Sequence, residues 1–313
     1  MTLFLGVDGG GTKTEFVLIE ADGEVVARAL TGTTYHLQVG LDVAVARLAE
    51  GIAAVCGKAG IAPGDLGHAF FGLPAFGEDA AIDPLLDAAC ARLLGHDRYG
   101  CDNDMVCGWA GSLACADGIN LVAGTGSIGY GERQGRKARA GGWGEVFSDE
   151  GSAYWIAIQG LNLFTRMSDG RLVKTPLWQA FRAALGLEKD LDICARVMGD
   201  RGMGRDEIAG LAPLVSRAAQ AGDAHALAVL ARAGAELAAI AQALREQLEF
   251  AVEETVLLSW SGGVLTKLEA VRQPFLDSLA RAGRYEVVAP LHEPGVGAAL
   301  YAVSLERAAA PRA

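Results

Sequence analysis

The sequence predicts an α/β protein of two domains, on the strength of three observations. Short apolar strands alternate with helical segments along the 313 residues, and 51% of the residues are apolar, enough for packed cores. The opening order of strands and helices restarts after residue 116. Glycine occurs 42 times, which indicates many tight turns and close backbone approaches.

Three consecutive antiparallel strands open the predicted N-terminal domain, residues 1–116. Asp22-Gly23, between the second and third strands, is a strong hairpin signal. Hydrophobic spacing then predicts the order β-β-β-α-β-α-β-α. The predicted strands are Leu3–Asp8, Glu15–Glu20, Glu24–Leu30, Ala69–Leu73 and Tyr99–Cys101. The predicted helices are Leu41–Cys56, Ala80–Leu94 and Met105–Ala116.

The pattern restarts in the predicted C-terminal domain, residues 117–313. A unit of strand, Gly/Thr-rich turn and strand thus occurs twice, near residues 3–20 and 120–132, as a weak internal duplication. Asp223 is expected to cap a long helix, and the last helix, about 297–307, to pack back on the N-terminal domain. The predicted strands are Asn120–Ala123, Ile128–Glu132, Arg136–Ala140, Thr255–Trp260 and Glu286–Ala289. The predicted helices cover 151–167, 211–221 and 223–250, with another from Leu265.

Charge and cysteine content argue against several function classes. The 27 basic and 38 acidic residues give a net charge of −11 with both signs interspersed, unlike a protein that binds nucleic acid or an anionic membrane. The apolar N-terminus is too short for a signal peptide, and no transmembrane helix is expected, so we expect a cytoplasmic protein. The six cysteines form no CxxC pair and histidine is rare, which disfavours zinc and redox chemistry.

The first segment that carries chemistry is Asp8-Gly9-Gly10-Gly11-Thr12-Lys13. Three glycines let backbone N–H groups approach a phosphate, while Thr12 and Lys13 add a hydroxyl and a positive charge. Asp8, at the end of a strand, is suited to Mg²⁺. A P-loop is excluded, because Thr12 separates Gly11 from Lys13 and a strand follows. A plain glycine-rich hairpin is the alternative.

Two further glycine-rich turns follow predicted strands. Gly124-Thr125-Gly126-Ser127 begins a match to the dinucleotide pattern GxGxxG, but turn-like sequence follows it where a helix is required. We interpret it as a second phosphate-binding hairpin, in which Thr125 and Ser127 donate hydrogen bonds. A dinucleotide site and an inert turn are the alternatives. Ser261-Gly262-Gly263-Val264 joins a strand to a helix and can hold a base and ribose, or be only a tight turn.

Asp102-Asn103-Asp104 lies between the end of a predicted strand and the start of a predicted helix. Ligands of open α/β sheets bind at this edge, and a carboxylate there can accept a proton from an attacking hydroxyl. Aspartate is also a common helix N-cap. The residues alone leave catalysis and capping open.

The segment Gly141-Gly142-Trp143-Gly144, followed by Ser148–Ser152, suits a sugar. A Trp flanked by glycines can lie over the apolar face of a sugar ring, and Asp149 can bind two hydroxyls. Alternatively, Trp143 belongs to a core and Asp149 caps the helix after Gly151.

In this order the segments resemble the sugar kinase/Hsp70/actin ATPase superfamily, and more closely the BadF/BadG-type ATPases that include N-acetylglucosamine kinase. VDGGGTKT resembles the phosphate-1 loop, AGTGS the phosphate-2 loop and WSGGV the adenosine motif. GGWG followed by SDEGSAYW is similar to N-acetylglucosamine kinase in particular. The resemblance covers nearly the whole chain. It implies two RNase H-like (actin-like ATPase) domains with mixed sheets around an interdomain cleft.

The resemblance also implies an activity, with ATP and Mg²⁺ as cofactors. It implies phosphorylation of a small amino sugar, first N-acetylglucosamine at its 6-hydroxyl, with glucosamine as the alternative. Asp104 aligns with the catalytic base, and Asp8 and Asp102 are the expected metal ligands. The expected ATP contacts are Gly9, Gly10, Gly11, Thr12, Lys13, Thr125, Gly126, Ser127, Gly262 and Gly263. The expected sugar contacts are His36, Asp104, Gly142, Trp143 and Asp149.

One departure and two rival functions accompany the resemblance. In Thr33-Thr34-Tyr35-His36, Tyr35 stands where mammalian N-acetylglucosamine kinase has an Asn that contacts the sugar. An activator-type ATPase needs cysteine ligands for a shared iron–sulfur cluster, and the spacing here offers no such set. A non-enzymatic sugar sensor of this fold needs a helix-turn-helix before the first strand, where this chain begins. A homodimer is expected from the family alone.

Overall fold

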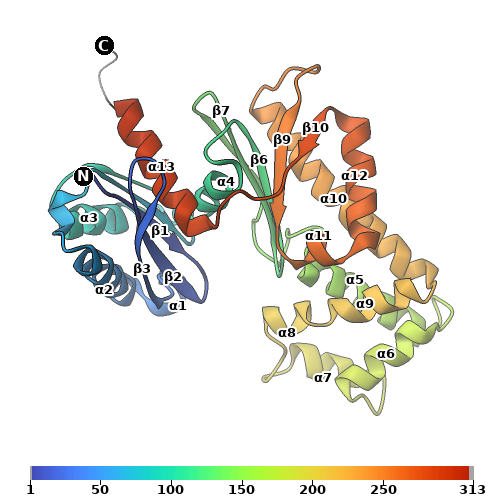
Figure 1. The fold of residues 1–313 in the computed structure, drawn as a ribbon. Coiled ribbons are helices and arrows are strands. Elements are labelled where there is room, and N and C mark those ends of the chain that lie inside the picture. The colour runs from blue at the N-terminus through green and yellow to red at the C-terminus, as the bar shows by residue number, and fades with distance from the viewer. Residues whose placement is uncertain (1, 310–313) are drawn as a thin grey trace. The chain divides into compact units, whose positions relative to one another are not determined.

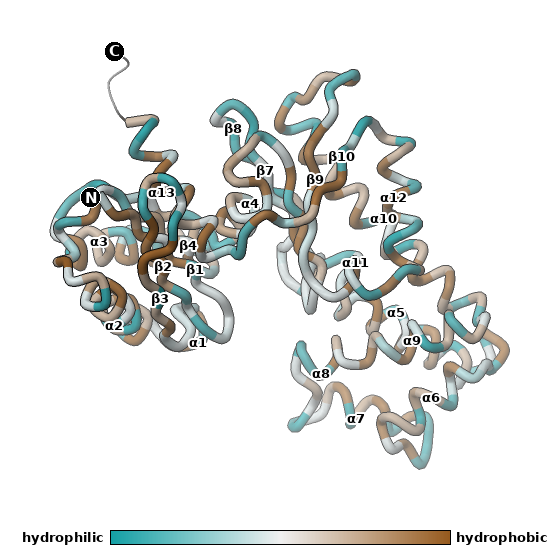
Figure 2. Tube along the Cα trace, viewed as in Figure 1, coloured by the Kyte–Doolittle hydropathy of each residue, from teal (hydrophilic) through white to brown (hydrophobic). Residues whose placement is uncertain are grey.

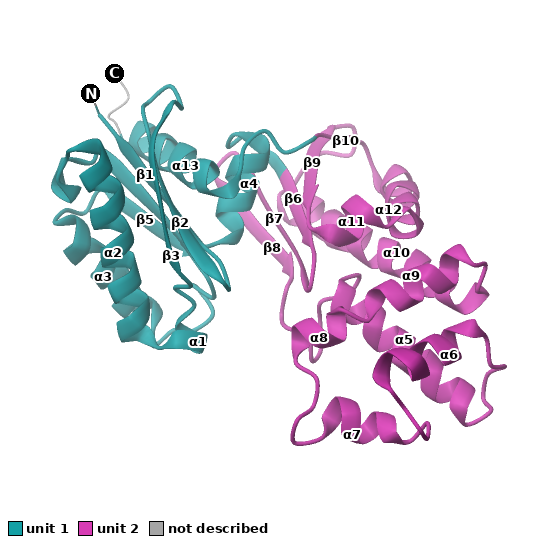
Figure 3. Cartoon of the chain, turned by 60° about the horizontal axis from the view of Figure 1, so that its bottom comes forward, with its two compact units in different colours: residues 1–118, 289–313 teal, residues 119–288 magenta. Residues whose placement is uncertain are grey.

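The computed structural model describes residues 2–309 and contains two compact units. Unit 1 comprises Met1–Gly118 and Ala289–Ala313, and unit 2 comprises Ile119–Val288 (Figure 3). Each unit has its own five-stranded mixed sheet with helices packed on it. The predicted α/β class with two mixed sheets is therefore confirmed.

The sheet of unit 1 has the strand order β3-β2-β1-β4-β5 (Figure 1). β1 pairs antiparallel with β2 and parallel with β4, and β5 pairs parallel with β4. The carboxyl ends of β1, β4 and β5 therefore share one edge of the sheet. The strands are β1 Phe4–Gly9, β2 Lys13–Ile19, β3 Val25–Gly32, β4 His68–Leu73 and β5 Tyr99–Asn103. The helices are α1 His36–Val39, α2 Leu41–Ala59, α3 Asp83–Leu94, α4 Met105–Leu113 and α13 Pro294–Ala309, with a 3₁₀ turn at Pro63–Asp65.

Helices cover both faces of this sheet because the side chains of its strands alternate. On β4, Phe71 belongs to the core under α2 and α3, while Phe70 stacks edge-on against Tyr301 of α13 at 4.8 Å between ring centroids. α13 approaches closely: a side chain on Gly297 would overlap the backbone of Gly111 in α4. Figure 1 shows α13 running along β1, far away in the sequence. α13 thus helps to hold α4, which begins directly after Asp104.

The sheet of unit 2 has the order β10-β9-β6-β7-β8. Counted along the chain within each unit, the sheet of unit 1 reads third, second, first, fourth, fifth from β3, and the sheet of unit 2 reads the same when followed from β8. Strand order thus supports the internal duplication. Figure 2 shows hydrophobic residues along β2 and β9, one strand from each sheet. The strands are β6 Gly118–Ala123, β7 Ser127–Arg133, β8 Arg136–Gly141, β9 Val256–Ser261 and β10 Tyr285–Val287.

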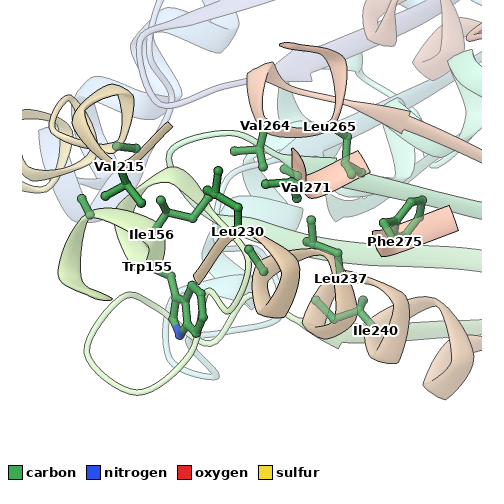
Figure 4. Packing of buried hydrophobic residues seen from close by; sticks show 14 of the residues in the cluster. Trp155, Ile156, Val215, Leu230, Leu237, Ile240, Val264, Leu265, Val271 and Phe275 are labelled. Carbon is green, nitrogen blue, oxygen red and sulfur yellow. The ribbon is translucent and has the colours of Figure 1, made fainter. Parts of the chain in front are cut away.

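The core of unit 2 centres on the long helix α10, Ala224–Gln247. Figure 4 shows Leu230 and Leu237 of α10 among Ile156, Val264 and Val271. By length and composition alone α10 could cross a membrane. Its buried side chains and its packing against α12 identify it as a core helix of this unit. The other helices are α5 Ala153–Ser168, α6 Pro176–Leu185, α7 Asp192–Met198, α8 Arg205–Ala209, α9 Ala212–Gln220, α11 Gly263–Lys267 and α12 Glu269–Ala282.

Most predicted elements are confirmed to within a few residues, and Asp223 caps α10 by accepting from the N–H groups of His225 and Ala226. Three helices between residues 176 and 209, α6 to α8, were not predicted. They are short, and α8 has only 5 residues, too few to show a helical period. The helix predicted from Leu265 is also two helices, the first beginning at Gly263.

Candidate active site

The first glycine-rich loop, Gly9–Lys13, joins β1 to β2 at the carboxyl edge of the unit 1 sheet. The Gly10 N–H donates to the Lys13 carbonyl at 2.9 Å, which closes the loop. A side chain on Gly9 would lie 2.8 Å from Thr34 Oγ1, so the fold requires glycine there. By contrast, a side chain on Gly11 would meet no atom of residues 2–309 within 4 Å. The exposed tip of this first loop is therefore open to a ligand.

Asp8, Asp104 and Cys107 lie together beside this first loop. Cys107 Sγ donates to the Val7 carbonyl at 3.6 Å, and a side chain on Gly72 would overlap that sulfur. Burial raises the pKa of Asp8 to about 6, opposed by a hydrogen bond with Cys107. Burial, and then the charges of Asp8 and Asp104, raise the pKa of the Cys107 thiol well above its ordinary value. The buried thiol thus stays protonated between two carboxylates, a role that the sequence did not reveal.

The side chain that accepts a hydrogen bond from the first N–H of α4 is that of Asn103. Its Oδ1 accepts from the Met105 N–H at 3.3 Å. Asp104 occupies the N-cap position without a side-chain cap hydrogen bond. Asp102 Oδ1 instead accepts from the Asn103 N–H at 2.8 Å. The capping alternative for the two aspartates is therefore not what the structure shows.

Asp8 and Asp102 share a rung of the sheet, since both pair with Gly72. They face the same side but are two strand spacings apart, roughly 10 Å between Cα atoms. Residues 2–309 contain no group of three potential metal ligands. This arrangement fits the usual mode of Mg²⁺, which keeps several waters and takes one or two carboxylates together with substrate phosphates.

The segment Thr33–His36 is tied to the first loop. Thr33 Oγ1 donates to the Gly10 carbonyl at 2.6 Å, and the Thr34 N–H donates to Thr14 Oγ1 at 3.2 Å. His36 is only 6% exposed, and neither ring nitrogen has a hydrogen-bond partner within residues 2–309. A buried imidazole normally has one, so His36 is suited to a ligand or water.

The second glycine-rich turn, Gly124–Ser127, joins β6 to β7 in unit 2. Its Thr125 carbonyl accepts from the Tyr154 N–H at 3.1 Å, which docks the turn on the start of α5. Ser127 is buried, and its hydroxyl donates to the Glu150 carbonyl at 2.7 Å. A hydroxyl has one proton to donate. In this structure Ser127 therefore fixes the turn, and Thr125 carries the hydroxyl at the cavity described next.

A cavity of about 410 Å³ adjoins the second turn, within the range of small-molecule sites. Thr125 and Gly263, which the sequence assigned to different parts of a nucleotide, both line it. Gly262 has a φ of 90°, and any side chain added to it would overlap the Ala123 carbonyl, so glycine is required at this turn. The other lining residues are Gly124, Ala153, Ala209, Gly210, Ala212, Pro213, Ser216, Arg217, Gln220, Val264, Lys267 and Leu268.

The wall contributed by α8 and α9 was missed from the sequence. Small residues such as Ala209 and Ala212 leave room for a ligand, and Arg217 and Lys267 bring positive charge to its rim. No glycine-rich motif marks this stretch. Tertiary folding alone brings it beside the second turn.

The predicted sugar contacts in unit 2 occupy two places. Trp143 is 71% exposed, which excludes a core role, and lines a second cavity of about 440 Å³ with Phe147 and Glu150. Asp149 does not line that cavity; it is 2% exposed and paired with Arg205 at 2.6 Å. Nor does Asp149 cap α5.

The cap of α5 is Ser152, whose Oγ accepts from the Trp155 N–H at 3.1 Å. The backbone leading to Trp143 is also specialised. Gly141 and Gly142 have φ values of 70° and 69°, a region that favours glycine.

Comparison with known proteins gives consistent matches along the chain. The model of the BadF/BadG/BcrA/BcrD ATPase family matches residues 5–302. An N-acetyl-D-glucosamine kinase of Dictyostelium discoideum is 29% identical over 320 residues, 97% of this chain and 99% of that protein. An N-acetylmuramic acid/N-acetylglucosamine kinase of Clostridium acetobutylicum is 29% identical over 308 residues, with coverage of 97% and 99%. A crystal structure of a "Putative N-acetylglucosamine Kinase" from Chromobacterium violaceum aligns with TM-score 0.71 and 27% identity over 97% of this chain and 99% of that one.

Proposed function

Because the chain belongs to the BadF/BadG/BcrA/BcrD ATPase family, we propose that it transfers the γ-phosphoryl group of ATP to an amino sugar. N-acetylglucosamine, phosphorylated on its 6-hydroxyl, is the preferred acceptor. Two relatives that match almost end to end carry N-acetylglucosamine kinase in their names. A solved structure with a similar name has a similar fold.

The observation that carries this proposal is the cavity shared by Thr125 and Gly263. Those two residues come from separate motifs, one suited to phosphate and one to a nucleoside. Their meeting in one hollow of about 410 Å³ is what a nucleotide requires. The adenosine group would occupy this cavity, and Gly262 would allow the tight turn between β9 and α11 that borders it.

The phosphates would be held by backbone N–H groups and hydroxyls of the first loop, Gly9–Lys13, and the second turn, Gly124–Ser127. Thr12, Lys13 and Thr125 supply the polar side chains, and Gly10, Gly11 and Gly126 leave the backbone accessible. Mg²⁺, held by Asp8 with Asp102 on the same rung, would neutralise phosphate charge. Positioning and charge stabilisation account for most catalysis of this reaction class.

Asp104 would act as general base and accept the proton of the attacking sugar hydroxyl. It stands at the carboxyl edge of the unit 1 sheet, where its side chain does not cap α4. His36, with both ring nitrogens unpaired within residues 2–309, would contact the sugar from the same unit. In unit 2, Trp143, Gly142 and Asp149 would contact the sugar.

The choice of acceptor depends on the residue at position 35. Tyr35 replaces the family Asn near the N-acetyl group, and glucosamine is therefore the alternative acceptor.

We propose a cytosolic location, where ATP is available; all six cysteines, each within residues 2–309, are free thiols. A homodimer is proposed on family grounds only.

A coupled ADP-release assay tests the proposal directly. N-acetylglucosamine, glucosamine, N-acetylmannosamine and glucose are compared at equal concentration with ATP and Mg²⁺. We expect N-acetylglucosamine to give the highest kcat/KM. A preference for glucosamine would select the alternative, and turnover of none of the four would overturn the kinase assignment.

A further inference from the structure

A single guanidinium, that of Arg205 at the start of α8, contacts two residues of unit 2 that the proposed function uses, Asp149 and Gly126, and a third residue, Glu145. Its Nη2 lies 2.6 Å from Asp149 Oδ2, and its Nε lies 3.3 Å from Glu145 Oε2. A side chain on Gly126 would overlap the same Nη2. Arg205 therefore rests directly on the second turn, Gly124–Ser127, while two carboxylates tether it.

Asp149, the main partner of Arg205, is held in a demanding conformation. Its side chain is 3% exposed, and its φ of 62° lies in the left-handed region, which costs a non-glycine residue on the order of 1 kcal/mol. Its Oδ1 faces the Ser127 N–H at 3.5 Å, a weak contact. Among residues 2–309, Arg205 is the strong partner of this carboxylate, and a buried carboxylate without a cation is strongly disfavoured.

The ion pair does not use all the hydrogen-bonding capacity of Asp149. A carboxylate offers about four lone-pair sites, and Arg205 uses one of them. The guanidinium fixes the direction of the remaining sites, because a tether through both Nε and Nη2 allows little rotation. Glu145 matters for the same reason, since it restrains the second side of the fork.

We propose that Arg205 is a positioning residue for the sugar: it orients the Asp149 carboxylate and, through Gly126, sets that carboxylate in register with the phosphate-binding turn. The inference rests on the proposed function, in which Asp149 contacts the sugar. It assigns α8, a helix absent from the sequence prediction, a role in acceptor binding. Misplacement of a binding group by about 1 Å is enough to reduce turnover roughly a hundredfold.

Arg205→Gln and Arg205→Lys test the proposal, with Asp149→Asn and the double variant Arg205→Gln/Asp149→Asn completing a cycle. We expect Arg205→Gln to raise the KM for the sugar roughly 10- to 100-fold, the scale of losing a hydrogen bond between the sugar and a charged group. Arg205→Lys should lose less than Arg205→Gln, since lysine keeps the positive charge but lacks the planar pair of donors. The double variant should be no worse than the poorer single variant, because both residues act through one contact.

Two further measurements separate positioning from a loss of folding or of nucleotide binding. ADP affinity, measured by calorimetry without sugar, should stay within about threefold of wild type in Arg205→Gln, since the nucleoside cavity does not include Arg205. Arg171→Gln is the matched control, because it removes an exposed ion pair with Asp169 in the same unit. It should leave the sugar KM unchanged.

Three results would overturn the inference: an unchanged sugar KM in a folded Arg205→Gln protein, effects of the two single variants that multiply, or an equal loss of ADP affinity. A wild-type protein that phosphorylates no amino sugar would overturn the proposed function and this inference together. An active wild type with any of the three results would overturn the inference alone.

Discussion

The sulfur of Cys107 fills the position that a side chain on Gly72 would occupy. Gly72 lies on β4 in the same rung as Asp8 and Asp102, between the two, so the thiol takes the place of a side chain between two acidic residues. Gly72→Ala should therefore destabilise the protein by about 1–3 kcal/mol, the usual cost of overpacking a buried site. The midpoint of urea unfolding measures this change.

Cys107→Ala in the Gly72→Ala background is the control for that explanation. Removing the sulfur should return part of the lost stability, with a residual cost because Asp104 Cα would still lie 3.3 Å from the new methyl group. If the two substitutions destabilise additively, the sulfur is not the obstacle at Gly72.

Asp104→Asn should lower kcat by roughly 10² or more, the scale of the loss of a general base. ADP affinity should remain near wild type, because the proposed nucleoside cavity lies wholly in unit 2. Steady-state kinetics and calorimetry give the two quantities. Asp97→Asn is the control: it neutralises an exposed carboxylate just before β5 and should change neither. Near-normal turnover of Asp104→Asn would exclude Asp104 as the base.

The local sequence predicted the glycine-rich turns well, because a run of glycines marks a turn by its residue type alone. Gly9 and Gly262 lie at turns that the sequence marked, although the contacts that require glycine there, with Pro74 and Thr34 and with the Ala123 carbonyl, come from distant segments. Cys107, Arg205 and Lys267 were missed because each acquires its role from tertiary contacts with distant segments. Ser127 shows the opposite kind of error. Its residue type suggested a hydroxyl that donates a hydrogen bond to phosphate, but in the folded protein this hydroxyl donates to the Glu150 carbonyl.

The stability of the metal-free protein should depend on Asp8. Its pKa is raised from 3.8 to about 6, so the folded state binds the proton more tightly than the unfolded state. The stability that protonated Asp8 contributes is complete below about pH 4 and is lost as the pH rises through about 6. Asp8→Asn should thus be more stable than wild type at pH 8 by on the order of 1–3 kcal/mol, and similar at pH 4. Thermal unfolding in EDTA at the two pH values measures the difference, and an equal difference at both would refute the assignment.

Gly263→Leu should block the nucleoside cavity while leaving the fold intact. Gly263 is exposed and its φ lies outside the left-handed region, and the nearest atom to an added Cβ is Lys267 Cδ at 3.9 Å. Because Lys267 also lines the cavity, the larger side chain would extend along the cavity wall and take up space needed by the nucleoside. We expect ADP affinity to fall roughly tenfold or more, the scale of about 1.4 kcal/mol, while sugar binding without nucleotide stays unchanged.

Calorimetric titrations with ADP and with N-acetylglucosamine give both affinities for Gly263→Leu. Gly57→Leu is the matched control, since Gly57 is exposed on α2 in unit 1 and a side chain there meets no atom of residues 2–309 within 4 Å. It makes the same chemical change away from the cavity and should alter neither affinity. If Gly263→Leu binds ADP as wild type does, the nucleoside lies elsewhere, and the cavity shared by Thr125 and Gly263 loses its proposed role.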